Sequence, residues 1–205
     1  SIEQLNLFGD KYTKVFSEIK QARLCIKHKD MDGLSKVLDG KLVKYVDSKD
    51  FNLKDLSNAL KTVINSVYGL TSAKFENKFR DSRNVDNIVA KRGALFMVDL
   101  LNAVQEQGYT VAHIKTDSIK IPDADDKIIK FVMDFGKKYG YEFEHEATYE
   151  KMCLVNDAVY IAKYADGEHE FEIPTTGEKI MTSWTATGAE FAVPYVFKTL
   201  FTKSK

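Results

Sequence analysis

The sequence predicts an α+β protein, because its helix-like and strand-like patterns are segregated along the chain rather than alternating. Apolar residues recur at helical spacing over residues 11–29, 52–69 and 88–107, in the first half of the chain. From Tyr109 onward, β-branched and aromatic runs separated by turn signals replace most of that pattern. The 205 residues suffice for one large domain or two small ones.

The first half is expected to consist of helices. One covers residues 11–29, and a shorter piece covers residues 34–45. Asn52 is a suitable N-cap for a helix that runs to about Tyr68 and ends near Gly69. Residues 88–107 form a further long helix. The expected apolar faces of the first and third of these helices are Val15, Ile19, Ala22 and Ile26, and Leu56, Leu60, Val63 and Val67.

The second half is expected to place strands around one amphipathic helix, residues 123–139. Residues 110–114 and 119–121 flank the turn-forming triplet Thr116-Asp117-Ser118, which is a strand–turn–strand pattern with a carboxylate at its tip. The alternating segment 141–146 predicts a half-exposed strand. A further β-rich run covers residues 152–164.

Charge and composition exclude several classes of protein. The 44% hydrophobic residues and 3 prolines argue against disorder and collagen-like repeats, and no apolar run approaches the ~20 residues of a membrane span. Residues 1–80 hold 15 basic and 10 acidic side chains, whereas residues 81–205 hold 15 and 20. A polyanion would therefore prefer the first part, although chance surface variation explains the difference equally well. Cys25 and Cys153 lack metal or CxxC spacing and predict free thiols in a reducing, cytoplasmic compartment.

Three groups of residues could carry chemistry, each with a simpler alternative. Lys61, Asn65 and Tyr68 share a helix face, where an ammonium can neutralise phosphate and a ring can stack on a base; a solvated polar face is the alternative. The turn Lys115–Ser118 carries Asp117, a possible ligand of a divalent metal, or is an ordinary turn. The basic stripe of the first helix could hold a triphosphate or simply be solvated, and it consists of Lys20, Arg23 and Lys27.

Two of these groups resemble signatures of the family B DNA polymerases. The run Lys-Thr-Val-Ile-Asn-Ser-Val-Tyr-Gly at residues 61–69 is similar to the Kx3NSxYG fingers signature at every fixed position. About fifty residues later, Lys-Thr-Asp-Ser at 115–118 resembles the DTDS palm signature, and residues 156–160 lie where the family has its KxY motif. The resemblance extends over about residues 10–165, and the short connecting segments resemble those of viral or phage enzymes.

The resemblance implies a fold with fingers helices at 1–75, part of a palm at 76–155 and the start of a thumb at 156–205. It implies that Lys61, Arg23 and Lys27 contact the phosphates of the incoming dNTP, with Tyr68 and Asn65 at its base and sugar. It also implies that Asp117 is a catalytic ligand of Mg2+, while Lys115, Ser118, Tyr160 and Lys163 lie near the primer-template DNA. In that chemistry two metal ions stabilise the charge that develops during nucleotidyl transfer.

The sequence departs from the family at three places. Lys115 replaces the first Asp of DTDS, and Ala158 replaces the lysine of KxY. No DxxSLYP-like motif with the other metal-binding Asp precedes Lys61. We therefore expect a fragment of a DNA-directed DNA polymerase that is inactive without the missing N-terminal part, or alternatively a non-catalytic nucleic-acid-binding module.

Other polar and aromatic groups are expected to be structural. The four histidines, His28, His113, His145 and His169, lack zinc spacing. Trp184 and the aromatic residues after it are expected to pack a small core rather than a partner surface.

Overall fold

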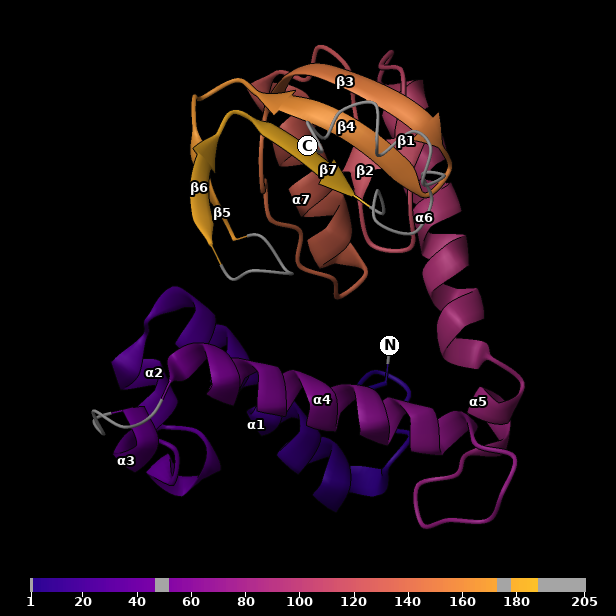
Figure 1. The fold of residues 1–205 in the computed structure, drawn as a ribbon. Helices are drawn as coiled ribbons and strands as arrows, with labels where there is room; N and C mark the ends of the chain where they lie inside the picture. Colours follow the sequence, from indigo (N-terminus) through magenta and orange to yellow (C-terminus); the bar gives the residue numbers. More distant parts are fainter. Residues whose placement is uncertain (1, 47–51, 173–177, 188–205) are drawn as a thin grey trace, which may run out of the picture. The chain divides into compact units, whose positions relative to one another are not determined.

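The computed structural model describes residues 2–46, 52–172 and 178–187, and it confirms the predicted α+β class (Figure 1). The chain divides into two compact units, residues 1–99 and 100–205. Helix α6 (Ile88–Glu106) crosses the boundary between them. The division into fingers, palm and thumb stays a prediction.

The first unit is helical. Its two long helices, α1 (Gly9–His28) and α4 (Leu53–Ser72), are accompanied by short ones. The short helices are α2 (Met31–Ser35), η1 (Leu38–Gly40), α3 (Val43–Val46) and α5 (Ser82–Val85). The predicted short helix at residues 34–45 is instead three pieces, α2, η1 and α3, the first of which already begins at Met31, and the sequence does not predict α5.

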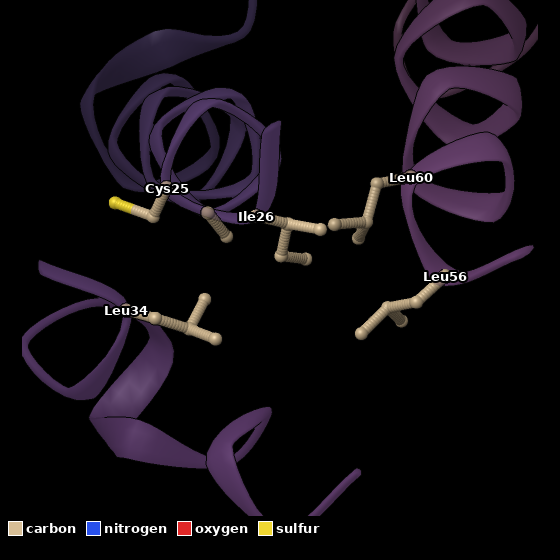
Figure 2. Close-up of a cluster of buried hydrophobic side chains, with 6 residues drawn as sticks. Cys25, Ile26, Leu34, Leu56 and Leu60 are labelled. Atoms are coloured by element: carbon tan, nitrogen blue, oxygen red, sulfur yellow. The ribbon is translucent and has the colours of Figure 1, made fainter. Parts of the chain in front are cut away.

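Two apolar clusters join α1 to α4 and fix them as an antiparallel pair. The C-terminal half of α1 packs on the start of α4 through the first cluster: Ala22, Cys25, Ile26, Leu34, Leu56 and Leu60 (Figure 2). The N-terminal half of α1 packs on the later turns of α4 through Phe16, Ile64 and Val67. The predicted apolar faces are wrong at two positions, because Val15 is 44% and Val63 is 43% exposed. Phe16 and Ile64, their immediate neighbours, face the core instead.

Helix α4 begins where the sequence predicts and ends later. The Asn52 side chain accepts a hydrogen bond from the Lys54 amide at 2.9 Å, which confirms the N-cap. The expected end near Gly69 is wrong, because the helix continues to Ser72. Its last turn contains Thr71, which is fully buried. The Thr71 hydroxyl accepts a hydrogen bond from the side-chain amide of Asn84 at 2.5 Å. This tertiary contact stabilises the last turn of α4, which the low helix propensity of Gly69 would otherwise weaken.

Replacing Asn84 with alanine is expected to destabilise the first unit by about 1–3 kcal/mol, because the buried Thr71 hydroxyl and the Val89 amide each lose a partner. Urea unfolding followed by circular dichroism measures the loss. Asn58→Ala, at an exposed position of α4, is the control and should change stability little. Equal stability of the Asn84 variant and the wild type would contradict this assignment.

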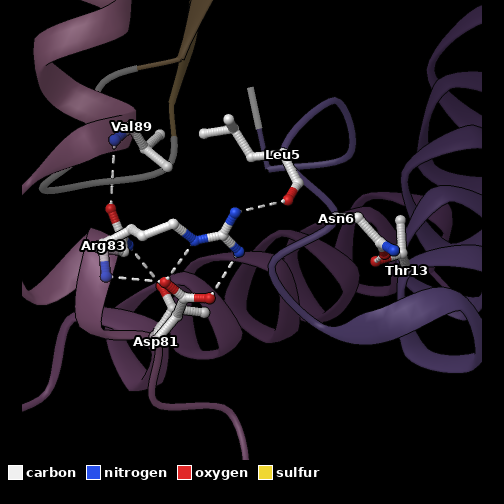
Figure 3. Close-up of polar contacts among 8 residues, drawn as sticks. Leu5, Asn6, Thr13, Asp81, Arg83 and Val89 are labelled. Atoms are coloured by element: carbon white, nitrogen blue, oxygen red, sulfur yellow. Dashed lines mark hydrogen bonds and ion pairs between the residues drawn. The ribbon is translucent and has the colours of Figure 1, made fainter.

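A second polar contact ties the start of the chain to α5. Arg83 pairs with Asp81 through a guanidinium nitrogen at 2.8 Å and also donates to the Leu5 carbonyl at 3.3 Å (Figure 3). The hydrogen bond from Arg83 lowers the pKa of Asp81 below its ordinary value. Asp81 also caps α5 by accepting from the Arg83 amide.

The described residues of the second unit form three separate antiparallel sheets. Strands β1 (His113–Ile114) and β2 (Ile119–Lys120) form a hairpin around residues 115–118, as the sequence predicts. The predicted 152–164 run is two strands, β3 (Tyr149–Asn156) and β4 (Val159–Tyr164), with β7 (Trp184–Thr187) beside β4. Strands β5 (His169–Glu172) and β6 (Lys179–Thr182) form the third sheet.

The expected strand at 141–146 is wrong. No residue of that segment joins a sheet. It follows helix α7 (Asp126–Lys138) and is held to the end of that helix, where the Tyr141 amide donates to the Gly136 carbonyl at 2.9 Å. A Cβ on Gly136 would come within 2.7 Å of the Phe143 ring, so this close approach requires glycine.

The remaining predictions on the fold have mixed outcomes. Cys25 and Cys153 are free thiols, buried and exposed respectively. Trp184 is 49% exposed, so the expectation that it packs in a core is wrong, and the aromatic residues after position 187 lie outside the described residues. None of the helices in the described ranges combines the length and apolar character needed to cross a bilayer.

Candidate functional site

The polar face of α4 is accessible within the first unit. Lys61 and Asn65 are exposed and Tyr68 is half-buried. Within the described part of the chain, no residue forms a hydrogen bond or ion pair with these three side chains. A Cβ added to Gly69 would meet no atom within 4 Å, so the backbone is open to close approach there. This face can therefore accept a ligand without first breaking an internal contact.

The basic stripe on α1 does not present three equivalent cations. Lys20 is paired with Glu3, which also accepts from the Ser17 hydroxyl at 2.6 Å. Arg23 is half-buried, and its Nε is buried with no hydrogen-bond partner in the described ranges. Lys27 is exposed. Arg23 is thus the cation of the stripe that has a buried donor, Nε, without an acceptor among the described residues.

Arg23 and Lys61 each stand next in sequence to a residue of the first apolar cluster, which joins α1 to α4. Arg23 follows Ala22 and Lys61 follows Leu60, and those two apolar residues belong to one buried cluster. Figure 2 shows Leu60 and Ile26 of that cluster pointing toward each other. The two cations therefore belong to the turns of α1 and α4 that contribute Ala22 and Leu60 to this cluster.

The hairpin of the second unit presents Asp117 to solvent. Asp117 and Thr116 are exposed at the tip, and the Lys115 amide donates to the Ser118 carbonyl at 2.8 Å to close the turn. Among the described residues none pairs with the Asp117 carboxylate. An exposed carboxylate on a closed turn is free to bind a cation or a hydrogen-bond donor.

The hairpin is attached to the β3–β4 turn by two side chains. The Lys115 ammonium donates to the Ala158 carbonyl at 2.9 Å, and His113 Nε2 lies 2.9 Å from the Asp157 carbonyl. Because a carbonyl only accepts, Nε2 carries a proton, and the buried Nδ1 has no hydrogen-bond partner in the described structure. The two contacts attach the hairpin that carries Asp117 to the β3–β4 turn.

Tyr160 lies in a buried ring cluster behind the hairpin. It is 8% exposed, and its ring centroid is 6.3 Å from His113 and 6.2 Å from Tyr149. The Lys120 ammonium lies 5.7 Å from the Tyr160 centroid, within range of a cation–π contact. Burial and the hydrogen bond with Tyr160 raise the pKa of Tyr149 well above its ordinary value, so that the Tyr149 phenol is neutral at physiological pH.

Lys163 is separated from this cluster. It is three residues from Tyr160 along β4 and therefore faces the opposite side of the sheet. Its ammonium pairs with Glu150 at 2.5 Å, and that hydrogen bond lowers the pKa of the Glu150 carboxyl. The predicted primer residues Tyr160 and Lys163 are thus not brought together.

The acidic residues do not form a magnesium site by themselves. Nowhere in the described ranges do three His, Cys, Asp or Glu side chains come close enough to hold a metal ion. Asp117 supplies one carboxylate, whereas Mg2+ between phosphates is usually held by one or two protein carboxylates together with the substrate. A two-ion site built on Asp117 would need a further carboxylate from outside the described residues.

An open pocket of about 420 Å³ adjoins the base of the hairpin rather than its tip. His113 and Asp157 are the residues it shares with the attachment described above. Its other lining residues are Leu101, Gln105, Val111, Ala112 and Ile114.

Sequence reasoning missed the residues that position the hairpin. His113 carries no recognisable spacing, and its acceptor is a backbone carbonyl, which any residue type supplies. Tyr149 and Glu150 were equally unmarked. One signal was present: Lys115 and Ala158 are the two positions that depart from the family signatures, and they contact each other.

The chain matches no protein-family model and no curated protein.

Proposed function

We propose that this chain is the fingers and partial palm of a DNA-directed DNA polymerase of the family B type, which adds dNTPs to a primer 3′ end. The observation that carries the proposal is that both signature segments stand on accessible surfaces. Lys61 and Asn65 are exposed on α4, and Asp117 is exposed at the tip of an anchored hairpin. Residues of an ordinary core or of internal ion pairs would not be left available in this way.

The contact between Lys115 and Ala158 supports the proposal because it relates the two positions at which the chain departs from the DTDS and KxY signatures. The resemblance implies a lysine at position 158 that holds the primer. Here residue 158 is alanine, and the Lys115 ammonium reaches its carbonyl from the neighbouring hairpin. We infer that Lys115 supplies the positive charge that residue 158 has lost, so that this spot still attracts a DNA phosphate.

Magnesium is the cofactor of the proposed reaction. Asp117 would contribute one ligand, and the second carboxylate would come from the Asp-containing motif absent from these 205 residues. Mg2+ would supply charge stabilisation at the transferring phosphate.

The test is primer extension by the complete polypeptide that contains these residues, assayed with a primer-template duplex, the four dNTPs and Mg2+. We expect dNTP-dependent extension. Upstream sequence that contains an Asp within an SLYP-like motif would support the same conclusion. No extension, together with no such motif upstream, would overturn the proposal.

Lys61→Ala is expected to raise the KM for dNTPs in that assay by about 10- to 100-fold, because an ammonium facing a triphosphate provides a charge-assisted contact. Alanine maintains the helix, so α4 should remain folded. Lys14→Ala, at an exposed position of α1, is the control and should leave the KM unchanged. An unchanged KM for the Lys61 variant would contradict the assignment of this face to the nucleotide.

The second candidate function is a non-catalytic nucleic-acid-binding module. It is favoured by the replacement of an acid by Lys115, which brings a cation next to Asp117 in the turn. The same assay separates the two candidates: a binding module shifts labelled DNA in a salt-dependent manner and extends no primer.

A further inference from the structure

One face of the β3–β4–β7 sheet carries exposed side chains in the described ranges. Along β4, Tyr160 and Ala162 are buried, whereas Ile161 between them is 42% exposed. Side chains alternate between the two faces of a strand, so Ile161 and Lys163 mark one face, which we call the outer face. The strand register adds Cys153 and Ala186 next to Ile161.

One row across the outer face combines two cations with an aromatic ring. In the strand register Lys151 lies opposite Lys163, and Lys163 lies opposite Trp184. These side chains therefore stand side by side on three adjacent strands. The Trp184 residue is 49% exposed, and the Lys151 side chain is 70% exposed. Within the described ranges the indole contacts no aromatic ring and forms no hydrogen bond.

The row keeps a net positive charge. Among the described residues, Glu150 is the acidic residue that reaches it, at 2.5 Å from the Lys163 ammonium and 4.0 Å from that of Lys151. Two ammonium groups thus share one carboxylate. An apolar protein partner would have to bury the excess cation at a large cost, whereas a phosphodiester chain would neutralise it.

We propose that the outer face binds single-stranded DNA, with a base stacked on Trp184 and phosphates held by Lys151 and Lys163. Stacking on an exposed ring beside basic side chains is how sequence-tolerant proteins hold single strands. The inference rests on the proposed function in taking DNA as the ligand. It adds a contact surface that faces away from the buried Tyr160 cluster.

Trp184 is the only tryptophan of the chain and therefore reports on this face directly. The 205-residue chain is titrated with short oligothymidylate at low salt, without Mg2+ or dNTPs, while its fluorescence is recorded. We expect saturable quenching that weakens as salt is added. Anisotropy of a labelled oligonucleotide should show affinity about tenfold lower for Trp184→Ala, with partial recovery in Trp184→Phe.

Lys151→Glu should weaken binding by about five- to tenfold and flatten its salt dependence. Lys179→Glu is the matched control, because Lys179 is also an exposed strand lysine paired with a glutamate, at 2.9 Å, but belongs to the third sheet. That variant should bind like the wild type.

Absent quenching, unchanged affinity of Trp184→Ala, or equal weakening by both lysine variants would overturn the inference. The outcome is separable from that of the proposed function. Binding at Trp184 with no primer extension by the complete polypeptide would support the outer-face inference and reject the polymerase proposal. Primer extension without an effect of the Trp184 or Lys151 variants would support the polymerase proposal and reject the outer-face inference.

Discussion

Asp117→Ala is expected to abolish primer extension by the complete polypeptide, with a loss of about 100- to 1000-fold or more, while DNA binding persists. The carboxylate is exposed at the tip of the β1–β2 hairpin and pairs with none of the described residues. Its removal therefore costs the fold little, and the effect should fall on the chemical step. Extension is measured by single-turnover kinetics, and binding by mobility shift.

Two further variants sharpen the result. Asp117→Asn preserves the shape of the side chain and removes its charge, so it should be as inactive as the alanine variant if the charge is what matters. Asp134→Ala, at a surface position of α7 where the carboxylate pairs with Lys130, should retain full activity. Normal extension by Asp117→Ala would refute the metal-ligand assignment.

Lys115→Asp restores the residue of the DTDS signature, yet we expect it to weaken primer binding by about tenfold or more. The substitution removes the ammonium bonded to the Ala158 carbonyl and sets a carboxylate facing that carbonyl. The double variant Lys115→Asp with Ala158→Lys should recover most of the loss, because it returns both positions to the family pattern. The KM for primer-template in the extension assay and the affinity from mobility shift measure both variants.

The controls for this pair separate charge from folding. Lys115→Met removes the ammonium without adding an acid and should give an intermediate loss. Ala158→Lys alone should bind at least as tightly as the wild type, because it adds a cation. Higher activity in Lys115→Asp than in the wild type would show that the lysine hinders the reaction instead of serving it.

Local signals predicted the helices well and their tertiary details poorly. The Asn52 cap follows from side-chain chemistry within one turn, and it is confirmed. The end of α4 depends on the buried bond between Thr71 and Asn84, thirteen residues apart, which no local pattern records. Val63 has the right spacing for the core, but α4 packs on two successive clusters, and the second one uses Ile64 and Val67.

The strand predictions show the same limit. Alternation at 141–146 indicates a strand only if a partner strand is available, and the end of α7 takes this segment instead. For the candidate site, the motif residues could be named in advance, but what holds them could not. The Lys115–Ala158 and His113–Asp157 bonds end on backbone carbonyls, so they leave no mark in the identity of the accepting residue.

The two thiols differ in a way that has a practical use. Cys25 is 2% exposed inside the first cluster, whereas Cys153 is exposed and stands beside Ile161 on the outer face. A maleimide reagent should therefore attach at one position of the unmodified 205-residue chain. A spin label or dye introduced there would sit next to the sheet surface without any engineered cysteine, and energy transfer from Trp184 to such a dye would follow that surface during titrations.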